Sequence, residues 1–239
     1  MSDWLLDLGN TRLKCAPLLA DGGIGPIRAI AHDAGDAWLQ ALPQGETAWL
    51  ASVVAVPLRV RVLQALCGRL ARIERATTLP RCGRLRIAYP EPVRLGVDRF
   101  LSMLAASAAG SSALVVGVGT ALTVDLVDAE GQHRGGRIAP SPGLMRQALH
   151  AQVPALPETG GRYAEFADAT EDALASGCEG AAIALVERSL ARAAALLGHT
   201  PALHVHGGGA AALAGHLPVH VAAPGLVLHG LAHWARATA

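Results

Sequence analysis

The sequence contains little of several residue types, and each shortage narrows what the chain can do. Of its 239 residues only 3% are aromatic, and Lys14 is the only lysine. The net charge of +1 gives no general electrostatic reason to expect nucleic-acid binding. No apolar run is both long enough and free enough of polar residues to span a membrane. A nucleic-acid partner and a membrane partner are therefore not expected.

The four cysteines form no C-x-x-C pair, and nothing at the N-terminus resembles a signal peptide. Asp3 and Asp7 interrupt the first residues before an apolar run develops. These features predict a reduced, cytoplasmic protein. Hydrophobic residues make up 51% of the chain, which is typical of a packed globular protein with one large domain or two small ones.

The positive charge is unevenly placed, because arginines crowd residues 59–86 with Glu74 as the only acid among them. Two interpretations are open. The arginines either coat a helix face and a turn, packing their stems and solvating their heads, or form a nucleic-acid patch. The first is favoured, because few aromatic residues are interleaved with them.

Two similar stretches lie about half a chain apart. Residues 114–128 read as an apolar strand, a glycine turn and a second apolar strand, and residues 4–14 repeat that layout. Such a repeat indicates an internal duplication. Exposed N–H groups at a glycine turn bind anions, so two facing turns would clamp a phosphate. In register, the pairs are Asp7 with Gly117, Gly9 with Gly119, and Asn10 with Thr120.

The remaining pattern predicts strands first and helices later in each half. Helices are expected after Pro57, where apolar residues recur at helical spacing as far as Leu70, from Asp98, at 143–149, at about 170–197 and from about Leu226. This order favours an α/β fold of two similar domains around a central cleft, residues 1–110 and 111–239, with mixed sheets. Further strands are expected at 48–54, 85–88, 203–206 and 218–221, and a short one after Gly135 and Gly136.

Several polar residues have both a chemical and a structural interpretation. Asp7 could reach a magnesium ion, or bond its own turn backbone. Lys14 could contact a phosphate, or simply be solvated. Asp98 and Arg99 could serve as a general base and a carboxylate clamp, although their spacing alone favours a helix cap and a surface arginine.

Two further patterns could bind ligands. The three glycines at 207–209 lie between a strand and a helix, where a backbone can approach an anionic or flat ligand closely. Two histidine pairs, His204 with His206 and His229 with His233, have spacings that allow zinc binding. Neither pair has an acidic or cysteine partner nearby, so a structural role is favoured for both.

Taken together, the motifs resemble the type III pantothenate kinases. The family's order is matched by DLGNT at 7–11, YPEPVRLGVDR at 89–99, GVGTALTVD at 117–125, GGRIAP at 135–140, HGGGA at 206–210 and LVLHGLA at 226–232. The resemblance implies a duplicated actin-like, ribonuclease-H-like fold and a homodimer. It also implies ATP-dependent phosphorylation of pantothenate, the first step of coenzyme A synthesis, with Mg²⁺ and a monovalent cation, K⁺ or NH₄⁺.

The resemblance assigns roles to individual residues. It implies that Asp98 is the general base and that Asp7 binds magnesium, with Asp125 as a ligand of the monovalent cation. A threonine supplied by the partner subunit corresponds to Thr170. The implied ATP and phosphate contacts are Asp7, Gly9, Asn10, Thr11, Lys14, Gly119, Thr120, Gly207 and Gly208. The implied pantothenate contacts are Tyr89, Gly96, Val97, Asp98, Arg99 and Thr170.

The chain departs from the family pattern at two places. Gly117 stands where the family usually has Asp. The internal repeat also shows that an acid is missing here, because Gly117 is the counterpart of Asp7. Ser141 replaces the glycine that usually follows Pro140. Loss of a carboxylate that helps to hold magnesium lowers rate or metal affinity. The alternative is therefore a catalytically weakened nucleotide-binding regulatory protein, with a transcriptional role like that of the Bvg accessory factors.

Overall fold

The computed structural model describes residues 2–32 and 35–238 and separates into two compact units. The first consists of Met1–Gly110, Gly131–His133 and Gly225–Ala239, and the second of Ser111–Glu130 and Arg134–Pro224. One boundary coincides with the predicted division after residue 110. The closing helix, however, belongs to the first unit. The division into two domains, residues 1–110 and 111–239, therefore stays a prediction.

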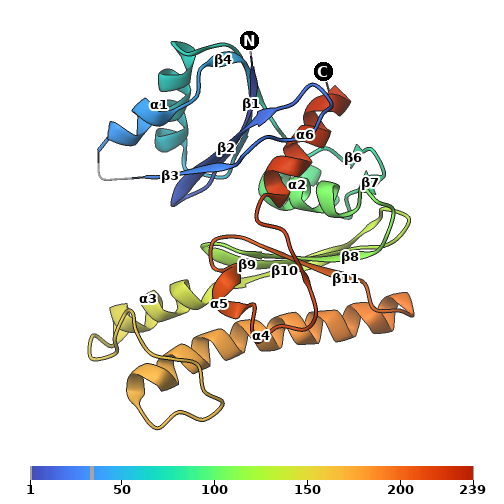
Figure 1. Ribbon diagram of the computed structural model, residues 1–239. Helices are drawn as coiled ribbons and strands as arrows, with labels where there is room; N and C mark the ends of the chain where they lie inside the picture. The colour runs from blue at the N-terminus through green and yellow to red at the C-terminus, as the bar shows by residue number, and fades with distance from the viewer. Residues whose placement is uncertain (1, 33–34, 239) are drawn as a thin grey trace. The chain divides into compact units, whose positions relative to one another are not determined.

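The first unit contains a five-stranded mixed sheet in the order β3-β2-β1-β4-β5 (Figure 1). Its central strand, β1, pairs antiparallel with β2 and parallel with β4. Leu5, Leu6 and Leu8 of β1 are fully buried, which explains why this apolar stretch forms an inner strand. The strands are β1 (Asp3–Leu8), β2 (Arg12–Leu18), β3 (Arg28–Ala31), β4 (Gly45–Ser52) and β5 (Leu70–Arg75).

The second unit repeats this topology. Its sheet has the order β10-β9-β8-β11-β12, and its central strand β8 again pairs antiparallel with the next strand and parallel with a later one. All six residues of β8 are buried. The strands are β8 (Ala113–Val118), β9 (Ala121–Val127), β10 (His133–Pro140), β11 (Ala202–His206) and β12 (Val221–Ala222). The matching strand orders confirm the duplicated mixed α/β fold that the sequence predicts.

Three helices complete the first unit: α1 (Val56–Cys67), α2 (Val97–Ala106) and α6 (Leu226–Thr238). The last two pack closely, because Gly230 lies against the backbone of Leu101, where a Cβ would overlap. Trp234 of α6 meets Trp49 of β4 edge to face at 6.0 Å. Short elements fill the connections: η1 (Ala37–Ala41), β6 (Arg81–Cys82), β7 (Leu85–Arg86) and η2 (Pro92–Arg94).

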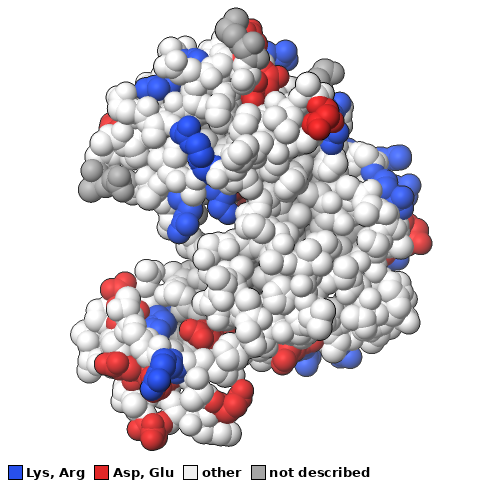
Figure 2. Space-filling model, in the orientation of Figure 1, with Lys and Arg blue, Asp and Glu red and all other residues white. Residues whose placement is uncertain are grey.

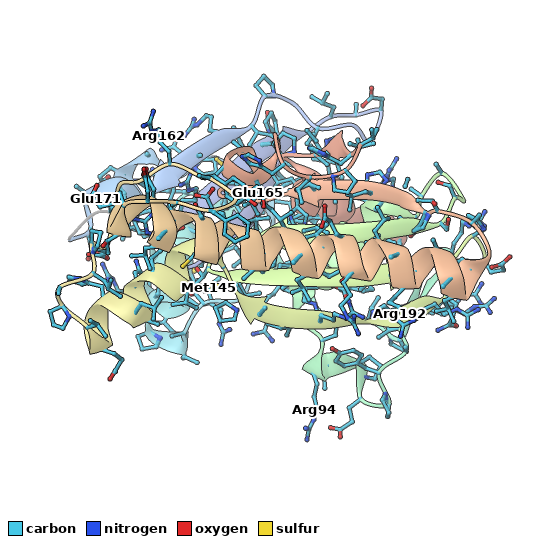
Figure 3. The ribbon with its side chains drawn as sticks, turned by 90° about the horizontal axis from the view of Figure 1, so that it is seen from below. Arg94, Met145, Arg162, Glu165, Glu171 and Arg192 are labelled. Atoms are coloured by element: carbon cyan, nitrogen blue, oxygen red, sulfur yellow. The ribbon has the colours of Figure 1, made fainter. Side chains whose placement is uncertain are left out.

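The second unit packs the long helix α4 (Thr170–Leu197) against one face of its sheet (Figure 1). Ala182, Ile183 and Val186 of this helix join the core formed by the apolar residues of β8, β9 and β11. Helix α3 (Pro142–Gln152) lies beside the first half of α4 (Figure 3), and α5 (Ala210–Leu213) is a single turn. Among the described residues, none of these helices is long and apolar enough to cross a membrane.

Several local predictions were wrong. Leu70 begins strand β5 instead of ending the preceding helix, because α1 stops at Cys67 and Gly68 caps it. Some of the crowded arginines, such as Arg72, therefore lie on a strand and not on the helix face. Gly135 and Gly136 lie within β10 rather than before it. The strand expected at 218–221 begins only at Val221, where it pairs with His204.

Candidate active site

The first glycine turn joins β1 to β2. Leu8 pairs with Leu13, and the N–H of Gly9 donates to the carbonyl of Arg12 across the turn at 3.2 Å. Asn10 and Thr11 form its exposed tip. The turn therefore presents the side chains that the sequence assigns to phosphate binding.

The second glycine turn occupies the equivalent place between β8 and β9. Val118 pairs with Leu122, and the N–H of Gly119 donates to the carbonyl of Ala121 at 2.9 Å. Gly119 and Thr120 are exposed. This turn is one residue shorter than the first, but its hydrogen bond closes it in the same way.

The third glycine turn packs directly on the second. Gly207 follows β11 with φ +104°, and a Cβ there would overlap the carbonyl of Val118 at the end of β8. The N–H of Gly209 donates to that same carbonyl at 3.0 Å. Gly208 is exposed at the tip. Glycine is thus required at position 207 by both backbone conformation and space, and the turn lies beside Gly119.

Three charged side chains come together in the first unit. Asp7 and Lys14 lie opposite each other on neighbouring strands, so their side chains share one face of the sheet. Burial raises the pKa of Asp7 from 3.8 to about 6, Lys14 acts to lower it, and the charge of Asp98 raises it further. The two carboxylates are therefore close enough to repel each other, as expected of ligands or neighbours of one cation.

The first turn of α2 orients Asp98. Gly96 is the N-cap residue, Val97 begins the helix, and Oδ1 of Asp98 accepts the N–H of Arg99 at 2.8 Å. A Cβ at position 96 would come within 2.7 Å of the same oxygen. Glycine at position 96 thus leaves room for the carboxylate of Asp98. The backbone angles of Gly96 are ones that other residues also adopt.

The structural alternative predicted that Arg99 lies on the surface, and the structure shows that its side chain is buried. Arg99 is only 7% exposed, its Nη1 donates to the hydroxyl of Tyr89 at 3.3 Å, and its guanidinium carbon lies 6.0 Å from the Tyr89 ring centre. The ring of His133 stacks on Tyr89 at 5.9 Å. Sequence reasoning missed His133, which belongs to no motif and lies far along the chain from the residues it contacts.

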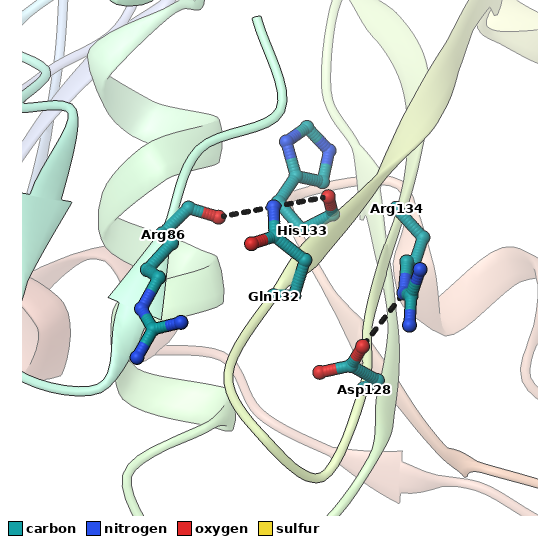
Figure 4. A network of polar contacts seen from close by, with 5 residues as sticks. All are labelled: Arg86, Asp128, Gln132, His133 and Arg134. Atoms are coloured by element: carbon teal, nitrogen blue, oxygen red, sulfur yellow. Dashed lines mark hydrogen bonds and ion pairs between the residues drawn. The ribbon is translucent and has the colours of Figure 1, made fainter.

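A short polar network holds the segment that carries His133. Nε2 of Gln132 donates to the carbonyl of Arg86 at 3.3 Å and to that of His133 at 3.1 Å (Figure 4). In the second unit, Arg134 pairs with the buried carboxylate of Asp128 at 2.6 Å (Figure 4). Residues 131–133 are thereby fixed to the first unit and bring the imidazole of His133 to Tyr89.

The remaining predicted residues lie in the second unit. Thr170 is the first residue of α4, as the sequence predicts, and it is exposed. Asp125 is 2% exposed on β9, opposite Val115. In residues 2–32 and 35–238 no group of three or more potential metal ligands occurs, so the structure adds no support for zinc at His204 with His206 or at His229 with His233.

Comparison with known proteins decides the family. The sequence profile of the type III pantothenate kinases matches residues 4–192. A protein from Stenotrophomonas maltophilia (strain R551-3) named type III pantothenate kinase is 55% identical over 238 residues, covering 98% of each chain. The chain belongs to the type III pantothenate kinase family. The family prediction is therefore confirmed, and with it an enzyme of the kinase class. The alternative of a weakened regulatory protein is not favoured.

Solved structures confirm the fold alone. A Campylobacter jejuni protein described as a Baf family transcriptional activator aligns with TM-score 0.62 at 18% identity, covering 95% of this chain and 94% of that one. A Sinorhizobium meliloti protein described as a 2-dehydro-3-deoxygalactonokinase aligns with TM-score 0.60 at 15% identity, covering 98% of both chains. Both proteins thus share the fold of this chain.

Proposed function

We propose that this chain transfers the γ-phosphoryl group of ATP to the hydroxyl of pantothenate, giving 4'-phosphopantothenate for coenzyme A synthesis. One observation carries the proposal for the site. In a member of this kinase family, Asp98 lies near Asp7, which pairs with Lys14, and next to the buried Arg99, which contacts Tyr89. This arrangement within one unit supports the assignment of a base, a metal ligand and a carboxylate-binding arginine.

Asp98 is the proposed general base. Its bond from the Arg99 N–H fixes the carboxylate at the start of α2. The pantothenate hydroxyl gives its proton to this carboxylate while the hydroxyl oxygen attacks the γ-phosphorus. The bond from that phosphorus to the bridging oxygen breaks, and ADP leaves. Such a transfer depends on positioning and charge stabilisation more than on covalent chemistry.

Asp7 is the proposed magnesium ligand. Magnesium in nucleotide sites is held by one or two carboxylates with phosphates and waters as the other ligands, and the carboxylate of Asp7 fits that donor set. When bound, Mg²⁺ neutralises charge on the β- and γ-phosphates. Lys14 adds a positive charge opposite Asp7. Asp125 is the proposed carboxylate ligand of K⁺ or NH₄⁺.

The three glycine turns are the proposed ATP contacts. Gly9, Asn10 and Thr11 would bind phosphate from the first unit. Gly119 and Thr120 would do so from the second, with Gly207 and Gly208 beside them for the adenosine end. Exposed N–H groups and short polar side chains at tight turns support this assignment.

Tyr89, Gly96, Val97 and Arg99 are the proposed pantothenate contacts. Guanidinium binds carboxylate in a planar, two-bond geometry, so Arg99 is assigned to the substrate carboxylate. Thr170 would come from the partner subunit of a homodimer. A cytoplasmic location is proposed, as the absence of a C-x-x-C pair and of a signal-peptide pattern predicts.

The surface around α4 supports the homodimer. Phe166, in the loop before α4, is 99% exposed in the single chain and lines a cavity of about 670 Å³ with Gly177 and Gly180 of the helix. Small residues on a long helix allow a second helix to approach closely. Figure 2 shows acidic and basic side chains together on the second unit, and Figure 3 labels Glu171 in the first turn of α4 and Glu165 beside the helix. A second copy would cover the exposed ring.

The assignment of Asp98 is tested by Asp98→Asn. The expected result is loss of pantothenate-dependent ADP formation with nucleotide binding and thermal unfolding retained, because the amide cannot accept the proton. Asp168→Asn, at an exposed loop carboxylate, is the matched control and should behave as the wild type. Unchanged turnover in Asp98→Asn would remove this residue from the base role.

A further inference from the structure

The two units differ at one equivalent position, and the difference involves a histidine. In the first sheet, Asp7 on the central strand pairs with Lys14 on one side and Ala51 on the other. In the second sheet, the equivalent Gly117 pairs with Thr123 and His206. The second sheet therefore has no carboxylate at this position. Instead, Thr123, Gly117 and His206 lie side by side on three neighbouring strands and form a row across the sheet.

The imidazole occupies the space above Gly117. A Cβ at position 117 would lie 3.1 Å from Nε2 and 3.2 Å from Cε1 of His206, and 2.7 Å from the hydroxyl of Thr123. Gly117 lies inside strand β8 and is not among the glycines with positive φ. Glycine is thus needed here for space and not for backbone conformation. A side chain at 117 and the ring of His206 exclude each other.

The location of this ring links it to the glycine turns. His206 is the last residue of β11 and immediately precedes Gly207, whose turn rests on the carbonyl of Val118. Gly117 precedes that valine and the Gly119 turn. The imidazole therefore lies at the base of the two turns of the second unit, with its Nε2 edge directed towards the centre of the row.

We infer that His206 is a nucleotide-binding residue whose Nε2–H donates to a phosphate oxygen of ATP. The inference rests on the proposed function, which places the ATP phosphates at these turns. A carboxylate at this position could face a triphosphate only through a cation, whereas an imidazole N–H binds the phosphate directly.

The first test compares His206→Ala with His206→Gln. Loss of one hydrogen bond to a charged group should raise the KM for ATP about tenfold in His206→Ala and leave the KM for pantothenate unchanged. The glutamine amide places an N–H near the position of Nε2, so His206→Gln should recover most of the ATP affinity. An unchanged KM for ATP in His206→Ala, or equal losses in both variants, would overturn the inference.

The second test is a double-mutant cycle with Gly117→Ala. If the added methyl group acts by displacing the imidazole, it weakens ATP binding in the wild-type background and has a much smaller effect in His206→Ala, where only its contact with Thr123 remains. Additive losses would show that residue 117 acts independently of His206 and would contradict the inference. Direct titration with a fluorescent ATP analogue gives the same comparison without turnover. Normal nucleotide binding without pantothenate phosphorylation would count against the proposed function alone.

Discussion

Replacing Asp7 by Asn should make the protein more stable at neutral pH while removing its activity. The pKa of Asp7 is raised from 3.8 to about 6, chiefly by burial and secondarily by the charge of Asp98, against the lowering effect of Lys14. At neutral pH the carboxylate of Asp7 is ionised, although its surroundings in the native state favour the protonated form. This mismatch lowers the stability of the native state. A neutral amide of the same shape removes that mismatch.

The magnitude follows from the shift. Each pKa unit corresponds to about 1.36 kcal/mol, so a shift of roughly two units destabilises the ionised native state by up to about 3 kcal/mol. Because the native pKa lies above the unfolded value, this loss is absent below about pH 4. It grows as the pH rises through the interval between the two pKa values, and it is complete above about pH 6.5. Asp7→Asn should therefore unfold roughly 5 °C or more above the wild type at pH 7.5.

The assay is thermal unfolding of both proteins at pH 4 and pH 7.5, without nucleotide or metal, together with kinase turnover. We expect the difference in unfolding temperature to vanish at pH 4. Turnover should fall by more than the roughly 10–100-fold that loss of an outer partner of a metal ligand costs. Asp168→Asn serves as the control at an exposed carboxylate. A variant that is less stable than the wild type at pH 7.5, or a difference independent of pH, would refute the reasoning.

Three further predictions concern packing, assembly and substrate binding. Gly230→Ala should lower the free energy of unfolding by about 1–3 kcal/mol in chemical denaturation, because its Cβ would overlap the backbone of Leu101; Gly143→Ala, whose Cβ would have its nearest neighbour at 4.0 Å, should not. Phe166→Asp should weaken the proposed homodimer about tenfold or more in sedimentation equilibrium, since it removes an exposed ring and adds a charge; an unchanged dimer would place the interface elsewhere. Arg99→Lys should raise the KM for pantothenate while leaving that for ATP unchanged, because lysine lacks the planar fork; equal changes in both would assign Arg99 to stability instead.

The repeated strand–turn–strand pattern made much of the fold predictable. Residues 4–14 and 114–128 each form a central strand and its antiparallel neighbour, with Gly9 and Gly119 in equivalent closing hydrogen bonds. A buried apolar strand followed by a glycine turn is a local pattern, so the chain's own neighbours determine it. Helix α4 was predicted for a similar reason, because its Ala- and Leu-rich run is long and uninterrupted.

What sequence reasoning missed depends on contacts between distant segments. Strand β3 (Arg28–Ala31) is only four residues long and mostly exposed, and it forms because it pairs with β2 at the edge of the sheet. Helix α6 was assigned to the second half, but Gly230 and Trp234 pack it against elements of the first unit. His133 reaches Tyr89 only because residues 131–133 lie with the first unit.

The candidate site shows the same division. The motifs named Asp98, Arg99 and Tyr89, but their spacing alone favoured a cap and a surface arginine. Only the structure gives the buried guanidinium and its bond to the tyrosine hydroxyl. It also explains Gly117, which lies in a strand beside an imidazole and a hydroxyl that leave no room for a side chain. Such an exchange of one side chain for another across a sheet has no local sequence signal.

The measurement that tests the central claim most directly is ATP consumption by the purified protein with pantothenate and Mg²⁺. It would be run with and without K⁺ or NH₄⁺, and the product would be identified by mass spectrometry. The account predicts ADP formation that depends on pantothenate, a product heavier by one phosphoryl group, and no such product from Asp98→Asn. A folded protein that binds ATP but phosphorylates no pantothenate under any of these conditions would contradict it.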